Sequence, residues 1–197
     1  NPTGNNINRA DIEFLLNNFS GVILIDEAYI NYSNQKTFIP ELTEYANLIV
    51  MQTLSKAWGL AALRVGIGFA SLDIIDLFNK VKPPYNINQA SQELALQALA
   101  ETNQVNDWIR VTVEERKKLR KQLTNYPFVK KIHASDANFV LVQVNKPNEL
   151  WKYLTSNEVI VRNRSKEVLC EGCLRITIGT PEENQHLVAL LNNYHEQ

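Results

Sequence analysis

The fold is decided by the stretch Leu48-Ile49-Val50-Met51-Gln52-Thr53-Leu54-Ser55-Lys56. Its first four residues form a continuous apolar run, which is typical of a parallel strand buried on both faces, and polar residues follow at once. Val22-Ile23-Leu24-Ile25 has the same pattern and stops at Asp26-Glu27. Ligands of open α/β sheets gather beyond the carboxyl ends of the strands, so both polar endings point toward one site.

The rest of the chain alternates helical and extended patterns. We predict further strands at about 66–70, 138–144, 159–162 and 173–178, and helices at about 8–19, 88–101, 105–125 and 148–156. Ser71 is expected to cap a helix that reaches about residue 81. Thr180-Pro181-Glu182-Glu183 is a capping box with proline at the first helical position, which predicts where the last helix begins.

Composition excludes several classes of protein. The 197 residues carry a formal net charge of −1, and the 20 Lys and Arg are spread along the chain. Such a chain has no basic field that would attract a phosphate backbone, so nucleic acid is not an expected partner. No apolar run approaches the roughly 18 residues that a membrane span requires, and no secretory leader pattern is present. We therefore expect a soluble protein with no membrane partner.

The only cysteines, Cys170 and Cys173, form one Cys-x-x-Cys. A structural zinc site needs four ligands, and the sequence offers no matching second pair, so we predict no metal site. Two free thiols fit a reducing cytoplasm. The chain begins with Asn1-Pro2-Thr3-Gly4 and no methionine, within what resembles a functional loop, and we expect it to be a fragment.

Asp26 and Lys56 follow the two buried strands and are the first candidates for chemistry. A carboxylate at such a position is costly to desolvate unless it meets a positive partner, and a protonated pyridine nitrogen is one such partner. The alternative for Asp26 is a helix N-cap or a structural ion pair. A lysine in a polar pocket near fixed positive charge loses its proton more readily and becomes a nucleophilic amine, although Lys56 could instead simply reach solvent.

Arg64 lies eight residues after Lys56, just before a Gly-x-Gly. Its planar guanidinium could bind a phosphate through two hydrogen bonds, helped by the hydroxyls of Ser55 and Thr53. The alternative is an ordinary surface arginine. The sequence therefore predicts a phosphate site in the same region as the candidate lysine and carboxylate.

In this order and spacing, these motifs resemble those of fold-type I pyridoxal-5'-phosphate (PLP) aminotransferases of class I and II. Within that superfamily the sequence is most similar to the histidinol-phosphate aminotransferase branch. The stretches that carry the resemblance are Asp26-Glu27-Ala28-Tyr29, 53–61, 83–88, Ala137-Asn138-Phe139 and 172–180. One departure is Ala62, where the family usually has glycine.

The resemblance implies a cofactor site for PLP. Lys56 would hold the cofactor as a Schiff base and move a proton between the substrate α-carbon and cofactor carbon C4'. Asp26 would pair with the pyridine nitrogen. Asn1 and Tyr29 would hydrogen-bond the ring hydroxyl, and Ser55 with Arg64 would hold the phosphate.

The resemblance also implies the substrates. Arg175 matches the arginine that binds carboxylates in this family, and Arg162 matches the arginine associated with the substrate phosphate. Arg164 could assist Arg162, or be a surface residue. The expected reaction is transamination between histidinol phosphate and glutamate or 2-oxoglutarate in histidine biosynthesis, by a cytoplasmic homodimer. Alternatives are an aromatic aminotransferase, a threonine-phosphate decarboxylase or a non-catalytic fragment.

The fold implied is α/β. Residues 1–85 would form the C-terminal part of a large PLP-binding domain with a mostly parallel sheet. Residues 86–197 would form a small α+β domain that includes the connecting helices.

Overall fold

The computed structural model describes residues 1–195. They form two compact units, each described here by itself. The Lys56 unit is Ile7–Trp108, and the Arg175 unit consists of Asn1–Asn6 together with the residues from 109 on. The border lies within the helix α4 (Thr102–Leu123). From the sequence, the domain boundary was predicted after residue 85, with the connecting helices assigned to the second domain. That domain assignment stays a prediction.

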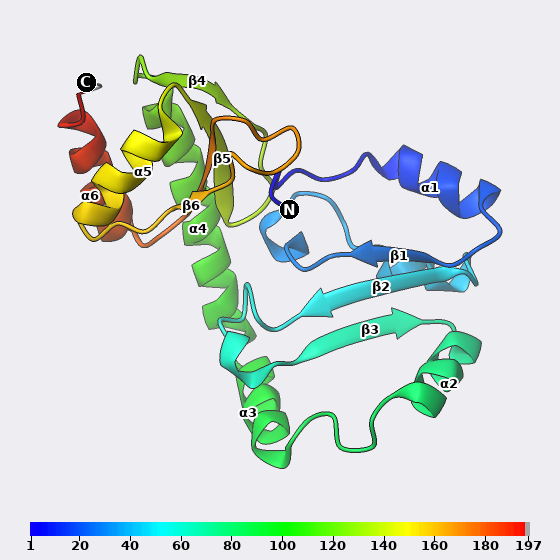
Figure 1. Ribbon diagram of the computed structural model, residues 1–197. Coiled ribbons are helices and arrows are strands. Elements are labelled where there is room, and N and C mark those ends of the chain that lie inside the picture. The colour runs from blue at the N-terminus through cyan, green and yellow to red at the C-terminus, as the bar shows by residue number, and fades with distance from the viewer. Residues whose placement is uncertain (196–197) are drawn as a thin grey trace. The chain divides into compact units, whose positions relative to one another are not determined.

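The Lys56 unit has a three-stranded mixed sheet with the strand order β1-β2-β3 (Figure 1). Strand β1 is parallel to β2, and β3 is antiparallel to β2. Its strands are β1 (Ile23–Asp26), β2 (Leu48–Thr53) and β3 (Gly66–Ala70), and its helices are α1 (Arg9–Asn18), α2 (Leu72–Val81) and α3 (Gln89–Ala100). Three short 3-10 helices lie at Ile30–Tyr32, Ile39–Thr43 and Ala61–Leu63.

Helix α1 supplies much of the core of this unit. It begins after Asn8, whose side chain accepts a hydrogen bond from the Ala10 amide at 3.0 Å. Its buried residues Ile12 and Leu16 form one cluster with Leu48 and Val50 of β2 and with Phe38, which lies between β1 and β2 in the sequence.

The prediction that β1 is buried on both faces was wrong. Burial alternates along the strand: Ile23 and Ile25 pack against the core cluster, whereas Leu24 is 52% exposed. Strand β1 is an edge strand that pairs only with β2 among the described residues. One of its faces therefore keeps an apolar side chain in solvent.

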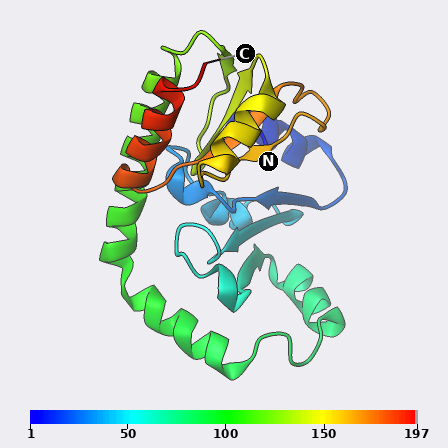
Figure 2. The same ribbon diagram turned by 60° about the vertical axis from the view of Figure 1, so that its left-hand side comes forward.

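The Arg175 unit has a four-stranded antiparallel sheet with the order β4-β5-β7-β6. Its strands are β4 (Val129–Ile132), β5 (Phe139–Val144), β6 (Arg162–Asn163) and β7 (Cys173–Thr177), and its helices are α5 (Pro147–Ser156), α6 (Pro181–Asn192) and the second part of α4. Helix α6 lies beside this part of α4 (Figure 2). Strand β4 was not expected from the sequence. A strand was expected over 159–162, but only Arg162 of that range lies in β6.

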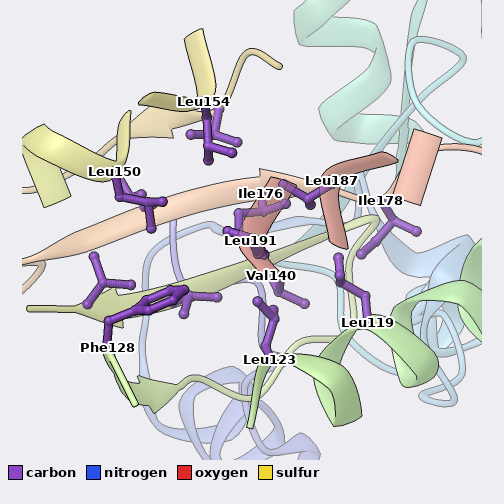
Figure 3. Close-up of a cluster of buried hydrophobic side chains, with 14 residues drawn as sticks. Leu119, Leu123, Phe128, Val140, Leu150, Leu154, Ile176, Ile178, Leu187 and Leu191 are labelled. Carbon is purple, nitrogen blue, oxygen red and sulfur yellow. The ribbon is translucent and has the colours of Figure 1, made fainter. Parts of the chain in front are cut away.

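Leucines of the three helices pack onto one face of this sheet (Figure 3). Val140 and Val142 of β5 face this core, as do Leu174 and Ile176 of β7. The residue between the two in each strand faces the other way, because side chains alternate along a strand. Leu141, Arg175 and Arg162 are cross-strand partners in register and therefore share the opposite face. Both arginines therefore lie on the face of the sheet opposite to the one covered by α4, α5 and α6.

Two predictions about helix starts had different outcomes. The capping box is confirmed: the Thr180 hydroxyl accepts from the Glu183 amide at 3.2 Å, and the Glu183 carboxylate accepts from the Thr180 amide at 2.8 Å. Ser71 does precede α2, but its hydroxyl donates to the carbonyl of Ala46 instead of capping the helix. Within residues 1–195, no helix is long and apolar enough to cross a membrane.

Candidate active site

Lys56 stands on a short loop that follows β2. Leu54 and Ala57 on either side of it are buried, whereas Lys56 itself is exposed. The loop turns because the Gly59 amide donates to the Lys56 carbonyl at 3.0 Å, with Gly59 at φ +69°, a conformation that glycine adopts without strain. The Lys56 Nζ lies 5.4 Å from the centre of the Tyr29 ring. Two predicted site residues from different loops are thus neighbours.

A cavity of about 250 Å³ lies in the Lys56 unit, at the carboxyl ends of β1 and β2. Its lining includes four of the predicted site residues, namely Asp26, Thr53, Ser55 and Arg64. The remaining lining residues are Ala28, Met51, Gln52, Val65 and Gly66. The parallel pairing of β1 with β2 explains why two polar endings far apart in sequence meet here.

Asp26 is the last residue of β1 and remains exposed at the cavity. One of its carboxylate oxygens accepts a hydrogen bond from the Ala28 amide at 2.9 Å. It is not a helix N-cap, because the next helix begins at Ile30 with Tyr29 in the cap position. The turn occupies one carboxylate oxygen and leaves a negative group at the cavity.

Arg64 has left-handed backbone geometry, with φ 58° and ψ 37°. This conformation costs a residue with a side chain roughly 1–2 kcal/mol, and Glu158 and Leu169 also have a positive φ. The Arg64 guanidinium donates to the carbonyl of Ala61 at 3.0 Å. The left-handed residue ends a short helix and turns the chain into β3. This geometry was not predicted, because the position is occupied by arginine and not by glycine.

The hydroxyl of Thr53 shapes the other side of the cavity. It accepts from the Ser55 amide at 3.1 Å and donates to the Val65 carbonyl at 3.3 Å. The Leu54 amide donates to the same carbonyl at 3.2 Å. These bonds tie the start of the Lys56 loop to Val65, the residue beside Arg64, so the backbones of the two segments that line the cavity are held together.

Glu27 and Gln52 were not among the residues predicted to have a role in the site. Glu27 is 5% exposed and accepts from the Thr37 hydroxyl at 2.6 Å, the Phe38 amide at 2.7 Å and the Gln52 amide group at 2.9 Å. Gln52 lines the cavity and is oriented by this carboxylate. The sequence did contain a signal for the buried position of Glu27. Side chains alternate along an extended chain, so only one of the adjacent carboxylates Asp26 and Glu27 can face the cavity.

Arg175 and Asn1 lie together in the Arg175 unit. The Arg175 guanidinium donates to the side-chain oxygen of Asn1 at 2.8 Å, and its central carbon lies 4.9 Å from the centre of the Phe139 ring. Arg162 lies opposite Arg175 on the neighbouring strand and is exposed. Arg164 instead pairs with Glu167. The structure thus brings together two of the predicted substrate and cofactor residues here and places Arg162 beside them.

Cys170 and Cys173 are free and buried. Burial raises the pKa of the Cys173 thiol, and neighbouring Cys170 and Glu171 raise it further. The Nε2 of His133 lies 3.9 Å from the Cys173 sulfur, and burial, with Lys131 nearby, lowers the pKa of His133. At neutral pH both groups are therefore mainly uncharged, which disfavours nucleophilic chemistry by the thiol.

The model of the family "aminotransferase class I and II" matches residues 1–191. The chain belongs to this family. A curated relative, the histidinol-phosphate aminotransferase of Cytophaga hutchinsonii, is 45% identical over 194 residues. The match covers 98% of this chain and 56% of that relative, so the chain spans little more than half of the relative's length. The resemblance to histidinol-phosphate aminotransferases, to the C-terminal part of their sequence, is thereby confirmed.

Solved structures of the same class confirm the fold. The histidinol-phosphate aminotransferase of Clostridium acetobutylicum superposes with a TM-score of 0.90 at 24% identity, covering 98% of this chain and 62% of that one. The enzyme of the same description from Sinorhizobium meliloti, solved in complex with pyridoxal-5'-phosphate, gives a TM-score of 0.76 at 21% identity. That match covers 87% of this chain and 49% of that structure.

Proposed function

We propose that the protein is a PLP-dependent aminotransferase that transfers an amino group between histidinol phosphate and 2-oxoglutarate. The observation that carries this proposal is the cavity beside Lys56, because its charges suit the two ends of PLP. The Arg64 guanidinium and the Ser55 hydroxyl suit the phosphate, and the Asp26 carboxylate suits a protonated pyridine nitrogen. The sequence identity to the Cytophaga hutchinsonii enzyme supports the same activity.

In this proposal, each residue of the Lys56 unit has one task. When bound, PLP supplies an electron-accepting ring that stabilises negative charge at the substrate α-carbon. Asp26 holds a proton on the ring nitrogen, and Lys56 anchors the cofactor and moves the proton at the substrate α-carbon. Ser55 and Arg64 bind the phosphate, and Thr53 positions Ser55, because the Thr53 hydroxyl accepts from the Ser55 amide and donates to the Val65 carbonyl. Tyr29, which lies beside the Lys56 ammonium, donates to the ring hydroxyl oxygen.

The Arg175 unit supplies the residues that bind the substrates. Two like charges directly opposite on neighbouring strands repel each other, and an anion held between them would offset that cost. Arg175 binds the carboxylate of glutamate or 2-oxoglutarate, and Arg162 binds the phosphate of histidinol phosphate. Asn1, held by Arg175, donates its amide hydrogens to the ring hydroxyl oxygen of the cofactor.

The half-reaction tests the proposal. PLP-loaded whole protein is mixed with histidinol phosphate, phenylalanine or threonine phosphate, and the change in the visible absorbance of the cofactor is followed. We expect turnover with histidinol phosphate and loss of the PLP band in Lys56→Ala. Preference for phenylalanine would favour an aromatic aminotransferase, and release of CO₂ from threonine phosphate would favour a decarboxylase. A whole protein without a PLP band would refute the proposal.

The 197-residue chain by itself is a separate sample. If it shows no PLP band while the whole protein does, the chain alone is a non-catalytic piece of the site. We also propose a homodimer in the cytoplasm, and the free buried thiols are compatible with a reducing compartment. Light scattering on the whole protein measures the oligomeric state, and a monomer at micromolar concentration would contradict the proposed dimer.

A further inference from the structure

Residues 1–6 belong to the Arg175 unit although the Lys56 unit follows them directly in the sequence. A single residue, Asp136, contacts this segment twice. The Asp136 amide donates to the Gly4 carbonyl at 2.7 Å, and the Asp136 carboxylate accepts from the Asn6 amide at 3.0 Å. The two bonds bracket Asn5, so they fix the segment in both position and direction. We call this pair of bonds the Asp136 clasp.

Gly4 lets the segment lie close to the sheet. It has φ +80°, and a Cβ atom at this position would lie 2.8 Å from the Phe139 ring and 3.1 Å from the Ser135 hydroxyl. The Arg175 guanidinium lies over the same ring, with its central carbon 4.9 Å from the ring centre. The aromatic ring therefore supports both the backbone of the segment and the arginine that holds Asn1.

The loop that carries Asp136 is itself fixed. Arg116 of α4 is 7% exposed and donates to the Ala137 carbonyl at 2.6 Å. Burial lowers the pKa of this guanidinium, and the negative charge of Asp136 partly offsets that effect. The Ser135 hydroxyl accepts from the Ala137 amide at 3.2 Å and donates to the Phe139 carbonyl. A buried cation and a local turn thus hold the clasp in one geometry.

We propose that Asp136 is a positioning residue: through the clasp it holds residues 1–6 so that Asn1 stays bonded to Arg175. This inference rests on the proposed function, in which Asn1 contacts the cofactor ring and Arg175 contacts the substrate carboxylate. Asn1 and Arg175 then move as one body. Loosening the clasp therefore changes carboxylate binding and the protonation of the bound cofactor together.

The first test needs neither cofactor nor activity. Amide hydrogen exchange of residues 1–6 is measured in the cofactor-free whole protein for wild type, Asp136→Ala, Asp136→Asn and Gly4→Ala. Asp136→Asn keeps an oxygen that accepts from the Asn6 amide, whereas Asp136→Ala does not. We expect exchange at Asn6 to be about tenfold faster in Asp136→Ala, with Asp136→Asn close to wild type. Unchanged exchange in Asp136→Ala overturns the clasp.

The second test separates positioning from a purely structural role. In the PLP-loaded protein, Asp136→Ala should raise the KM for 2-oxoglutarate about tenfold and shift the pH at which the visible band titrates, while Asp136→Asn restores both. Asp76→Asn removes a carboxylate from an exposed position of α2 and serves as the control, with both quantities unchanged.

The outcomes distinguish the two proposals. Faster exchange at Asn6 with unchanged KM and unchanged titration leaves a structural clasp and overturns the positioning role. Wild-type protein that neither binds PLP nor transaminates refutes the proposed function, and the positioning role falls with it, whatever the exchange shows. Gly4→Ala should reproduce the effects of Asp136→Ala, because the added methyl group pushes the segment off the Phe139 ring.

Discussion

Replacing Arg64 with glycine should separate stability from cofactor binding. The left-handed geometry of Arg64 costs roughly 1–2 kcal/mol, which glycine avoids. Glycine also increases the conformational entropy of the unfolded chain, which lowers the free energy of unfolding by about 0.5–1 kcal/mol. The exposed hydrogen bond to Ala61 contributes little against water. The free energy of unfolding of the cofactor-free protein should therefore be equal to that of wild type or higher by up to about 1.5 kcal/mol.

PLP binding should respond in the opposite direction. If the guanidinium makes two charge-assisted hydrogen bonds to the phosphate, each contributing about 1.5 kcal/mol, their loss lowers PLP affinity about 100-fold. Urea unfolding of cofactor-free protein measures the first quantity, and titration of the visible band with PLP measures the second.

Glu158→Gly is the matched control for Arg64→Gly. Glu158 also has a positive φ, of 62°, and it lies in the other compact unit. The same relief of strain is expected there, with unchanged PLP affinity. The reasoning is refuted if Arg64→Gly binds PLP like wild type, or if it destabilises the cofactor-free protein by several kcal/mol.

Three further predictions concern stability and are measured by urea unfolding. Leu174→Ala empties a fully buried site and should cost about 2–5 kcal/mol, whereas Val168→Ala at 87% exposure should change stability by less than about 0.5 kcal/mol; similar values for both would contradict the assigned core. Glu27→Ala leaves buried donors without their acceptor and should cost about 2–4 kcal/mol, so a neutral effect would argue against the observed bonds. The hydrogen bond from Lys118 lowers the pKa of Glu115. The wild-type protein should therefore have a higher free energy of unfolding than Glu115→Gln. This difference should be fully present above the unfolded-state pKa of about 4.3 and be lost as pH falls through the lowered folded-state pKa. An advantage that grows toward acid pH would have the wrong sign.

Periodicity and capping residues were enough to predict most elements of the fold. The apolar runs at 22–25 and 48–51 located the two parallel strands, and Thr180 with Glu183 located the start of α6. Strand β4 was missed because its sequence, Val129-Lys130-Lys131-Ile132, has charges in the middle and lies at the edge of its sheet. Edge strands depend on pairing with a neighbour more than on their own pattern.

The site was predictable where it lies at strand ends, and less so where loops form it. Asp26, Thr53 and Ser55 could be grouped from the rule that ligands bind beyond the carboxyl ends of parallel strands. The clasp at Asp136 joins segments 130 residues apart, which no local pattern encodes. The left-handed geometry of Arg64 is local, at the end of a short 3-10 helix, but the residue there is not the glycine that would have indicated it. The roles of the site residues stay predictions until they are measured.

Reduction of the PLP-loaded whole protein with borohydride tests the central claim most directly. Reduction fixes the cofactor permanently to the amine that carries it, and digestion with mass spectrometry then identifies the modified lysine. We predict a single modified peptide with the cofactor on Lys56, and none in Lys56→Ala. Modification of another lysine in the wild-type protein, with Lys56 unmodified, would contradict the account.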